Sequence, residues 1–303
     1  MPEAAMLIAI LTLALFNRGD NGYPQGGSLQ FSRDIERRYL ELGGKLHYRS
    51  KVAQILVEGG RSVGVRLAAG GEVRADIVIS AADGHATLFE MLGEAYLDSE
   101  TIRCYSTLKP FRPLVYVCLG INRDLSAEPH IVTNVLDPPI EFAGERHELL
   151  GWFHYCYDPS SAPHGKSAVV SMVETSFEFW ERAHRDSAVY AQEKHKVAGL
   201  VIDAMERRYP GIASQVEVID FATPLTWVRY TGNWRGAYEG WLPTREALSV
   251  TMKKSFPGLK DFYLCGQWVE PGGGVPVSVI SGRNVIKLIC KADRRSFAPL
   301  REQ

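Results

Sequence analysis

Residues 265–283, CGQWVEPGGGVPVSVISGR, are of types that can hold a flat or negatively charged molecule. Three consecutive glycines allow backbone angles and close approaches that a Cβ forbids. The apolar run after the proline predicts a final helix over Val277–Lys291. The N-terminus of a helix presents free N–H groups and the positive end of a dipole, which suit an anion or an electron-rich ring edge. The alternative, a glycine-rich loop that serves only as a tight strand-to-helix turn, stays open at this point.

Other kinds of catalytic or metal site find no support in the sequence. The eight histidines form no metal-binding spacing, and there is neither a G-x-S-x-G nucleophile motif nor a Walker loop. We therefore predict no metal site, and the catalytic residues stay unidentified. The cysteines are odd in number and widely spaced, which predicts reduced thiols in a cytosolic compartment. They are Cys104, Cys118, Cys156, Cys265 and Cys290.

The composition is that of an ordinary soluble globular protein. Among 303 residues, 46% are hydrophobic and 23% are charged, and the formal net charge is −1. Such a balance gives no electrostatic attraction toward nucleic acid. The length is sufficient for two domains, or for one domain interrupted by another.

The apolar segment Ala4–Phe16 predicts a buried helix. It is too short to span a membrane, which takes roughly 20 residues. Glu3 stands where a signal peptide would have Lys or Arg, and no cleavage site follows. A helix that is apolar on all sides needs partners on all sides, so we expect the chain to begin inside a larger fold.

The region that follows predicts a helix, a set of hairpins and a buried strand. Ser28 is the predicted N-cap of a helix whose apolar face carries Phe31, Ile35, Tyr39 and Leu42. Strands are predicted at residues 45–50, 52–58, 62–67 and 72–82, with glycine pairs at 59–60 and 70–71 as turns. The run over 76–82 is apolar without alternation, which suits a strand buried on both faces.

From about residue 105 to 241 the sequence predicts an antiparallel sheet with few helices. Strand-like runs cover residues 113–121, 148–157, 168–175 and 216–223, and one helix is predicted over 188–209. The aromatic side chains of this region fill a core in the default interpretation, and line a cavity in the alternative. They are Trp152, Phe153, Tyr155, Tyr157, Phe177, Phe179 and Trp180.

Three stretches resemble, in order, motifs of the phytoene-desaturase-like flavoproteins, a branch of the amine-oxidase-type FAD oxidoreductases. The first runs from YPQGG at residues 23–27 to ISAAD at 79–83, the second is FATPLTWVRYTGNWRGAYEGW at 221–241, and the third is FYLCGQWVEPGGGVPVSVISGR at 262–283. The second favours the desaturase-like branch over an ordinary amine oxidase. Glu270 and Arg229 lie within these motifs without an assigned acid or base role.

The resemblance implies that the glycine stretch lies against the isoalloxazine ring of FAD. The following helix would then direct its N-terminus at the N1 and C2 carbonyl edge, where it stabilises negative charge on the reduced flavin. Val52 matches the position whose backbone meets the adenine end. The cofactor-binding residues implied are Val52, Gly266, Gln267, Gly273, Gly274, Val275 and Pro276.

Two departures from the family pattern stand out. The dinucleotide fingerprint G-x-G-x-x-G, which holds the FAD pyrophosphate, occurs nowhere in the sequence. We therefore expect the fold to be incomplete at its N-terminus, and FAD binding by this chain without an upstream unit to be weak or substoichiometric. Val277 stands where the family commonly has a very small residue, and its branched side chain can crowd the flavin unless the turn shifts.

The fold class implied is α/β (α+β), with two interleaved lobes. Residues 23–95 and 256–303 would form an FAD-type lobe, and residues 96–255 a substrate lobe with an antiparallel sheet. The apolar helix within 1–22 would belong to the substrate lobe. The strands that end near Ala81 and Cys265 are predicted to be adjacent in a parallel sheet. If the N-terminal unit is absent, an exposed apolar patch should mark its place.

The function implied is that of an FAD-dependent desaturase or dehydrogenase that moves hydride between flavin and an apolar, carotenoid-like polyene or isoprenoid. The alternative is a truncated or split member that binds an apolar ligand or a partner chain without redox activity by itself. We expect an apolar small-molecule substrate, no nucleic acid and a cytoplasmic location. Peripheral membrane contact, and pairing as a homodimer or with a complementing chain, stay open.

Overall fold

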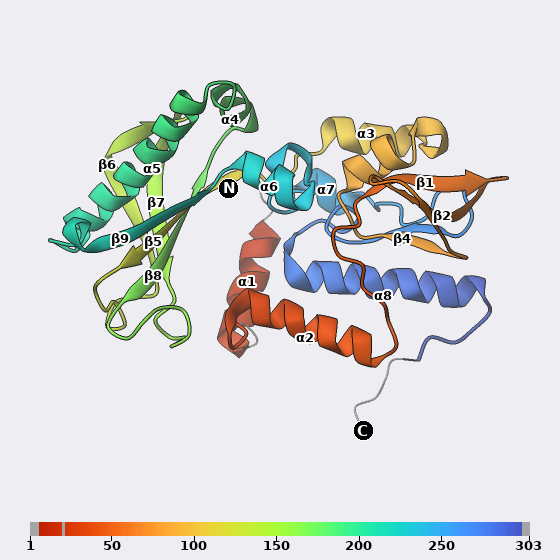
Figure 1. The fold of residues 1–303 in the computed structure, drawn as a ribbon, viewed down its shortest axis with the longest axis horizontal. Coiled ribbons are helices and arrows are strands. Elements are labelled where there is room, and N and C mark those ends of the chain that lie inside the picture. The colour runs from red at the N-terminus through yellow and green to blue at the C-terminus, as the bar shows by residue number, and fades with distance from the viewer. Residues whose placement is uncertain (1–5, 20–21, 299–303) are drawn as a thin grey trace. The chain divides into compact units, whose positions relative to one another are not determined.

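The computed structural model describes residues 6–19 and 22–298 and divides the chain into two compact units. Unit 1 comprises Met1–Arg18, His47–Phe111 and Thr231–Gln303, and unit 2 comprises Gly19–Leu46 and Arg112–Tyr230. The colours of Figure 1 show how each unit collects segments that are far apart in the sequence. The predicted lobes, with boundaries after residues 22, 95 and 255, are defined by the ligands that they would bind, and they stay a prediction.

Unit 1 contains a three-stranded antiparallel sheet of β1 (Val52–Glu58), β2 (Arg61–Leu67) and β3 (Glu72–Arg74). The glycine pairs 59–60 and 70–71 adopt positive φ angles at the two turns, as predicted. The predicted strand over 45–50 is wrong, because this stretch has no regular structure. The run 72–82 divides into two short strands instead of one, β3 and a separate strand further along.

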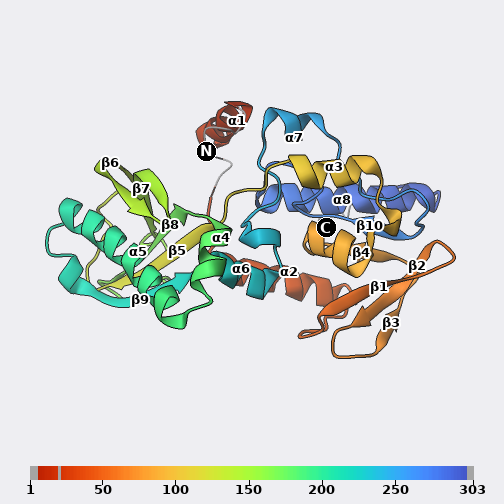
Figure 2. The same ribbon diagram turned by 90° about the horizontal axis from the view of Figure 1, so that it is seen from above.

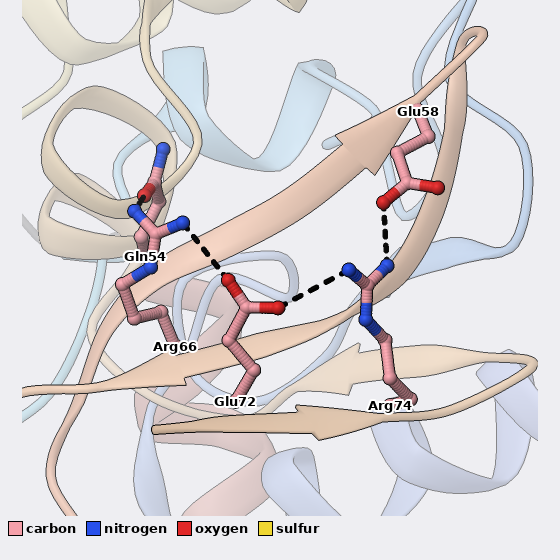
Figure 3. A network of polar contacts seen from close by, with 5 residues as sticks. All are labelled: Gln54, Glu58, Arg66, Glu72 and Arg74. Carbon is pink, nitrogen blue, oxygen red and sulfur yellow. Dashed lines mark hydrogen bonds and ion pairs between the residues drawn. The ribbon is translucent and has the colours of Figure 1, made fainter. Parts of the chain in front are cut away.

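One face of this sheet is covered by a chain of charged side chains (Figure 3). Arg66 donates to Gln54 at 2.6 Å and to Glu72 at 2.9 Å. Arg74 donates to the second oxygen of Glu72 at 3.1 Å and to Glu58 at 2.5 Å. These side chains are largely exposed, so each ion pair contributes little to stability. The main effect of the ion pairs is to keep this face of the sheet polar.

The remaining strands of unit 1, β4 (Val78–Ser80) and β10 (Phe262–Leu264), form a parallel pair. Phe262 lies opposite Val78, and Leu264 opposite Ser80, which confirms the predicted adjacency. Within the part of the chain that the structure describes, each of these two strands has the other as its only ladder partner. The prediction of burial on both faces is wrong for β4, because the side chain of Ile79 is 41% exposed.

Helices complete unit 1. Figure 1 shows α3 (Ser99–Thr107) and α8 (Gly274–Ala292) on opposite sides of β4, and the Ser281 hydroxyl of α8 accepts the Gly266 N–H at 2.9 Å. The core includes Leu88, Phe262, Leu264, Trp241 and Trp268. The shorter helices are η1 (Ala86–Met91), η2 (Glu94–Tyr96), η4 (Trp234–Gly236) and α7 (Arg245–Ser249).

Helix α1 (Met6–Arg18) confirms the predicted N-terminal helix, of which residues 4 and 5 lie outside the described part. The prediction that it is buried is wrong for the side chains described. Met6 is 77% exposed, Ile10 57% and Leu13 68%.

Unit 2 is built on a five-stranded sheet in the order β6-β7-β8-β5-β9, antiparallel throughout as predicted. The strands are β5 (Leu114–Ile121), β6 (Ile131–Phe142), β7 (Glu145–His154), β8 (Ser167–Glu174) and β9 (Val216–Ala222). The long helix α5 (Ser187–Arg208) runs along one face of the sheet (Figure 2) and buries Val197, Val201 and Met205 against it. The smaller helices are α4 (Phe177–Ala183), η3 (Ala213–Gln215) and α6 (Pro224–Thr231).

Of the seven aromatic side chains predicted to fill a core, three belong to the core of unit 2, namely Trp152, Trp180 and, partly buried, Phe179. Trp152 and Trp180 are at most 1% exposed, and the Trp180 indole donates to the Thr175 hydroxyl at 3.0 Å. Tyr157, by contrast, is 47% exposed and stacks on Tyr23.

Helix α2 (Gly27–Glu41) also belongs to unit 2. Its N-cap is Gly26, with φ 77°, and not the predicted Ser28, because the glycine supplies the left-handed turn into the helix. None of its residues is buried. Its predicted apolar face is therefore open, with Ile35 54% and Leu42 58% exposed.

Candidate functional site

The glycine loop, residues 266–274, connects β10 to α8 in unit 1. Gly266, Gly272, Gly273 and Gly274 all have positive φ angles, 101°, 122°, 69° and 79°. Side chains rarely adopt such angles, so the loop depends on glycine for its path. Helix α8 begins at Gly274, with Gly273 as its N-cap, and thus three residues before the predicted start at Val277.

Six of the seven residues predicted to contact the cofactor lie in or directly after this loop. Gly266 and Gln267 follow β10, and the other four lie between the N-cap and the first turn of α8. Val52 lies elsewhere in unit 1, at the start of β1. Their contacts with a flavin stay a prediction.

Gly240 and Trp241, at the end of the second motif, pack directly on the glycine loop. A Cβ at Gly240 would overlap the Gln267 backbone, which shows how closely the two chains approach. The Trp241 indole N–H donates to the Trp268 carbonyl at 3.0 Å, and the Gly272 N–H donates to the Trp241 carbonyl at 3.4 Å. Trp241 and Trp268 are almost fully buried, so these bonds are shielded from water.

Asp83, the last residue of the first motif, and the nearby His85 reach the same place. The Asp83 carboxylate is buried and accepts the backbone N–H of Ala86 and of Trp234, each at 2.8 Å. Burial raises the pKa of Asp83. His85 stacks between Phe89 and Trp234, with ring centroids 4.7 and 4.8 Å away. The fold thus unites all three motifs at the carboxyl ends of β4 and β10, which is where α/β sheets bind ligands.

Glu239 is the residue at this place that sequence reasoning missed. Its carboxylate touches Gly273, since a Cβ added there would overlap it, and it accepts the N–H of Gly274. Burial raises its pKa to about 6, and the hydrogen bond from Gly274 opposes that rise. The sequence gives no signal for this role, because a single acid between Tyr238 and Gly240 resembles any surface residue.

The loop and the helix start fit the edge of a flavin. The loop places backbone without side chains at the end of a parallel strand, so a flat ring can approach closely. The first N–H groups of a helix have no acceptor within it, and in α8 those of Val275 and Val277 follow the one that Glu239 accepts. These donors suit an electron-rich ring edge that gains negative charge on reduction.

Two buried polar atoms beside the loop have no hydrogen-bond partner among the described residues. They are the Tyr105 hydroxyl and the Trp268 indole nitrogen, and both residues line a cavity of about 20 Å³. Burial raises the pKa of Tyr105 strongly. The space is enough for about one water molecule and too small for a substrate.

Other candidate groups are accounted for structurally. The imidazole of His154 is buried and lies 3.0 Å from the Glu128 carbonyl, and His195 is exposed. The five cysteines are free. Over residues 6–19 and 22–298, no group of His, Cys, Asp and Glu is arranged to hold a metal ion, and no helix has the length and apolar character needed to cross a membrane.

Comparison with known proteins agrees with the geometry. The family model described as flavin containing amine oxidoreductase matches residues 2–289. Prolycopene isomerase of Daucus carota is 26% identical over 92% of this chain and 46% of that protein. The 4,4'-diapophytoene desaturase of a Methylomonas species is 24% identical over 90% of this chain and 54% of that protein. The chain thus spans about half the length of these relatives.

Solved structures show the same fold. An oxidoreductase from Methanosarcina mazei aligns over 87% of this chain and 55% of its own, with a TM-score of 0.57 and 19% identity. A putrescine oxidase variant aligns over 88% of this chain and 53% of its own, with a TM-score of 0.58 and 14% identity. The mixed α/β architecture is therefore shared with these two structures.

Proposed function

This chain belongs to the flavin-containing amine oxidoreductase family, and we propose that it is the flavin-edge and substrate portion of an FAD-dependent oxidoreductase acting on an apolar polyene or isoprenoid. The reaction is a desaturation or dehydrogenation in which hydride moves between substrate carbon and flavin. Relatives named as carotenoid desaturases and isomerases support this substrate class.

One observation carries the proposal. Three motifs far apart in the sequence meet at the carboxyl ends of β4 and β10, where the glycine loop opens onto the N-terminus of α8. The four glycines at positive φ also leave the backbone there without side chains, so a flat ring can approach it.

The residues of this chain would position and polarise the cofactor. Bound FAD supplies hydride transfer at its isoalloxazine ring. Gly273 and Gly274 would give the ring edge access, and the N-terminal dipole of α8 would favour negative charge there. Trp241 and Trp268 would fix the loop, since their hydrogen bond is buried. Hydride transfer to flavin does not demand a nucleophilic side chain.

The substrate would belong to unit 2, whose sheet we propose as the floor of the substrate lobe. Its strands alternate buried and half-buried side chains, so one face fills the core and the other remains available. An apolar substrate needs such a surface more than it needs charged groups.

A second function, apolar-ligand or partner binding without redox activity, is favoured by a specific observation. The outer face of α8 is apolar and open, with Val275 54%, Val279 62% and Ile280 50% exposed. A large open apolar face is typical of a surface that binds a partner. We propose a homodimer or a complementing chain as that partner.

FAD titration discriminates the two functions. We expect FAD to bind this chain weakly, and binding to be abolished in Gly274→Leu because the leucine blocks the approach of the ring. Gly282→Leu is the control, since it lies on α8 with no atom within 4 Å of its added Cβ. If Gly274→Leu binds FAD as the wild type does, the flavin does not lie at this loop. An absorbance spectrum without flavin under all conditions would favour the second function.

A further inference from the structure

Glu239 places its carboxylate at the N-terminus of α8, the same place that the edge of the proposed flavin would occupy. The carboxylate touches Gly273 and accepts the N–H of Gly274, the first residue of the helix. A helix N-terminus attracts anions through its free N–H groups and its dipole. In this structure, the protein's own side chain is therefore the anion at that place.

The backbone that follows Glu239 is held in place by its contacts with the glycine loop and with Phe111. The next residue, Gly240, is pressed against the Gln267 backbone, and its carbonyl accepts the N–H of Phe111 at 2.9 Å. Trp241 follows with its buried bond to Trp268. Because this backbone is held in place, the Glu239 side chain can leave the glycine loop only by rotating about its own bonds. Its charge can change by proton uptake without any movement.

No charged neighbour compensates Glu239 within the described part of the chain. Burial raises the pKa of Glu239 and the backbone N–H of Gly274 lowers it, and no Lys, Arg or His contributes to the shift. The nearest residues of its own segment that carry a titratable group are Tyr238 and Arg235, and neither shifts its pKa. An ionised carboxylate here is stabilised by little more than the helix end itself.

A flavin edge and an ionised Glu239 therefore compete. Both would lie at the N-terminus of α8, Glu239 on the Gly274 N–H and the ring edge on the donors that follow it. Reduction of the flavin would then bring two negative charges together at short range. A protonated Glu239 has neither problem, because a neutral carboxyl group does not repel the ring edge and can donate a hydrogen bond to it.

We propose that Glu239 is a positioning residue that guards the flavin site: its carboxylate occupies the N-terminus of α8 until it takes up a proton, and proton uptake accompanies flavin binding. This inference rests on the proposed function, because it concerns the same site. It adds a regulated property, a pH-dependent affinity for flavin, that the glycine loop by itself would not have.

The raised pKa of Glu239, about 6, supports the proposal by placing the switch within an accessible pH range. When only the protonated form is competent to bind, the apparent Kd is the intrinsic Kd divided by the protonated fraction. Between about pH 5.5 and about pH 7.5 that fraction falls on the order of tenfold or more, and affinity falls with it.

The experiment is an FAD titration by calorimetry of the wild type, Glu239→Gln and Glu246→Gln at about pH 5.5 and about pH 7.5. Glu246 is an exposed residue at the start of α7 and controls for the loss of one negative charge. We expect the wild type and Glu246→Gln to bind roughly tenfold more tightly at the lower pH. Glu239→Gln should bind equally tightly at both pH values.

Proton uptake gives a second readout that needs only the wild type. Repeating the titration at about pH 7.5 in buffers of different ionisation enthalpy should show close to one proton taken up per flavin bound. Flavin binding that is independent of pH, without proton uptake, would overturn the inference and leave the proposed function standing. Absence of flavin binding in every variant at both pH values would overturn both.

Discussion

The indole N–H of Trp241 donates to the carbonyl of Trp268 across 3.0 Å, and the two rings meet edge to face with centroids 5.0 Å apart. This contact joins the 221–241 motif to the glycine loop inside the core of unit 1. The conformation of the glycine loop therefore depends on contacts with Trp241, which is distant in the sequence. Changes at Trp241 should therefore reach the proposed flavin site.

Trp241→Phe should destabilise the protein by about 2 kcal/mol, from the lost hydrogen bond together with a small cavity. It should also weaken flavin binding. Trp180→Phe is a matched control, because Trp180 is equally buried and its indole also donates at 3.0 Å, to Thr175 of unit 2. Urea unfolding should show a similar loss in both variants, and flavin titration a loss in Trp241→Phe. Equal flavin affinity in the two variants would refute the link.

Glu239 should also affect stability without any ligand. Its pKa is raised in the folded state to about 6, so the native state binds a proton more tightly than the unfolded chain. Stability should therefore fall as pH rises from the ordinary glutamate range through about 6, by about 1 kcal/mol after allowance for partial exposure. Glu239→Gln should lack this decline and be the more stable protein above that pH. Thermal unfolding across the pH range measures the difference, and parallel curves would contradict it.

Removal of two tyrosine hydroxyls should change stability in opposite directions, because only that of Tyr190 has a partner among the described residues. The Tyr105 hydroxyl has no partner among the described residues, so Tyr105→Phe should stabilise unit 1 by about 1 kcal/mol. The Tyr190 hydroxyl lies 2.6 Å from that of Thr223, so Tyr190→Phe should destabilise by a similar amount. Urea unfolding compares the two. A destabilised Tyr105→Phe would indicate a bound water in the adjacent cavity.

The open face of α8 should make the purified chain self-associate. Val279 is 62% exposed, and Val279→Lys should shift sedimentation toward the monomer because it puts a charge in the apolar face. Ile102, 44% exposed on α3, provides the control variant Ile102→Lys, which should leave the distribution unchanged. A wild-type chain that is monomeric at high concentration would count against a partner at this face.

Patterns local in sequence predicted much of the fold. The glycine pairs fixed the turns of the β1–β2–β3 sheet, and the 3.6-residue periodicity fixed α5 almost to its ends. Strand β6 was missed, because Pro138 and Pro139 interrupt its ladder between Val135 and Ile140 and disguise the strand. The burial of β4 and α1 was predicted wrongly, since exposure depends on neighbours that a local pattern does not reveal.

The candidate site was predictable only in part for the same reason. Consecutive glycines before an apolar run are visible in the sequence, so the loop and its helix could be found. Glu239 and Asp83 act through contacts with Gly273 and Trp234, which are distant along the chain. A carboxylate that accepts hydrogen bonds from backbone N–H groups can have any residue type as its partner, so no sequence motif indicates the contact.

The parallel pair of β4 and β10 has a consequence for the order in which the chain folds. The Ser62 hydroxyl, for example, bonds the Asp261 carbonyl 199 residues further along, so unit 1 can close only after everything between has been made. Each doubling of such a loop costs only about 0.6 kcal/mol of closure entropy, so the native state tolerates the long insertion. The rate of folding is more sensitive, because distant contacts form late. During synthesis the sheet of unit 2 can therefore assemble first. Strand β4 stays unpaired until its partner β10 has been translated.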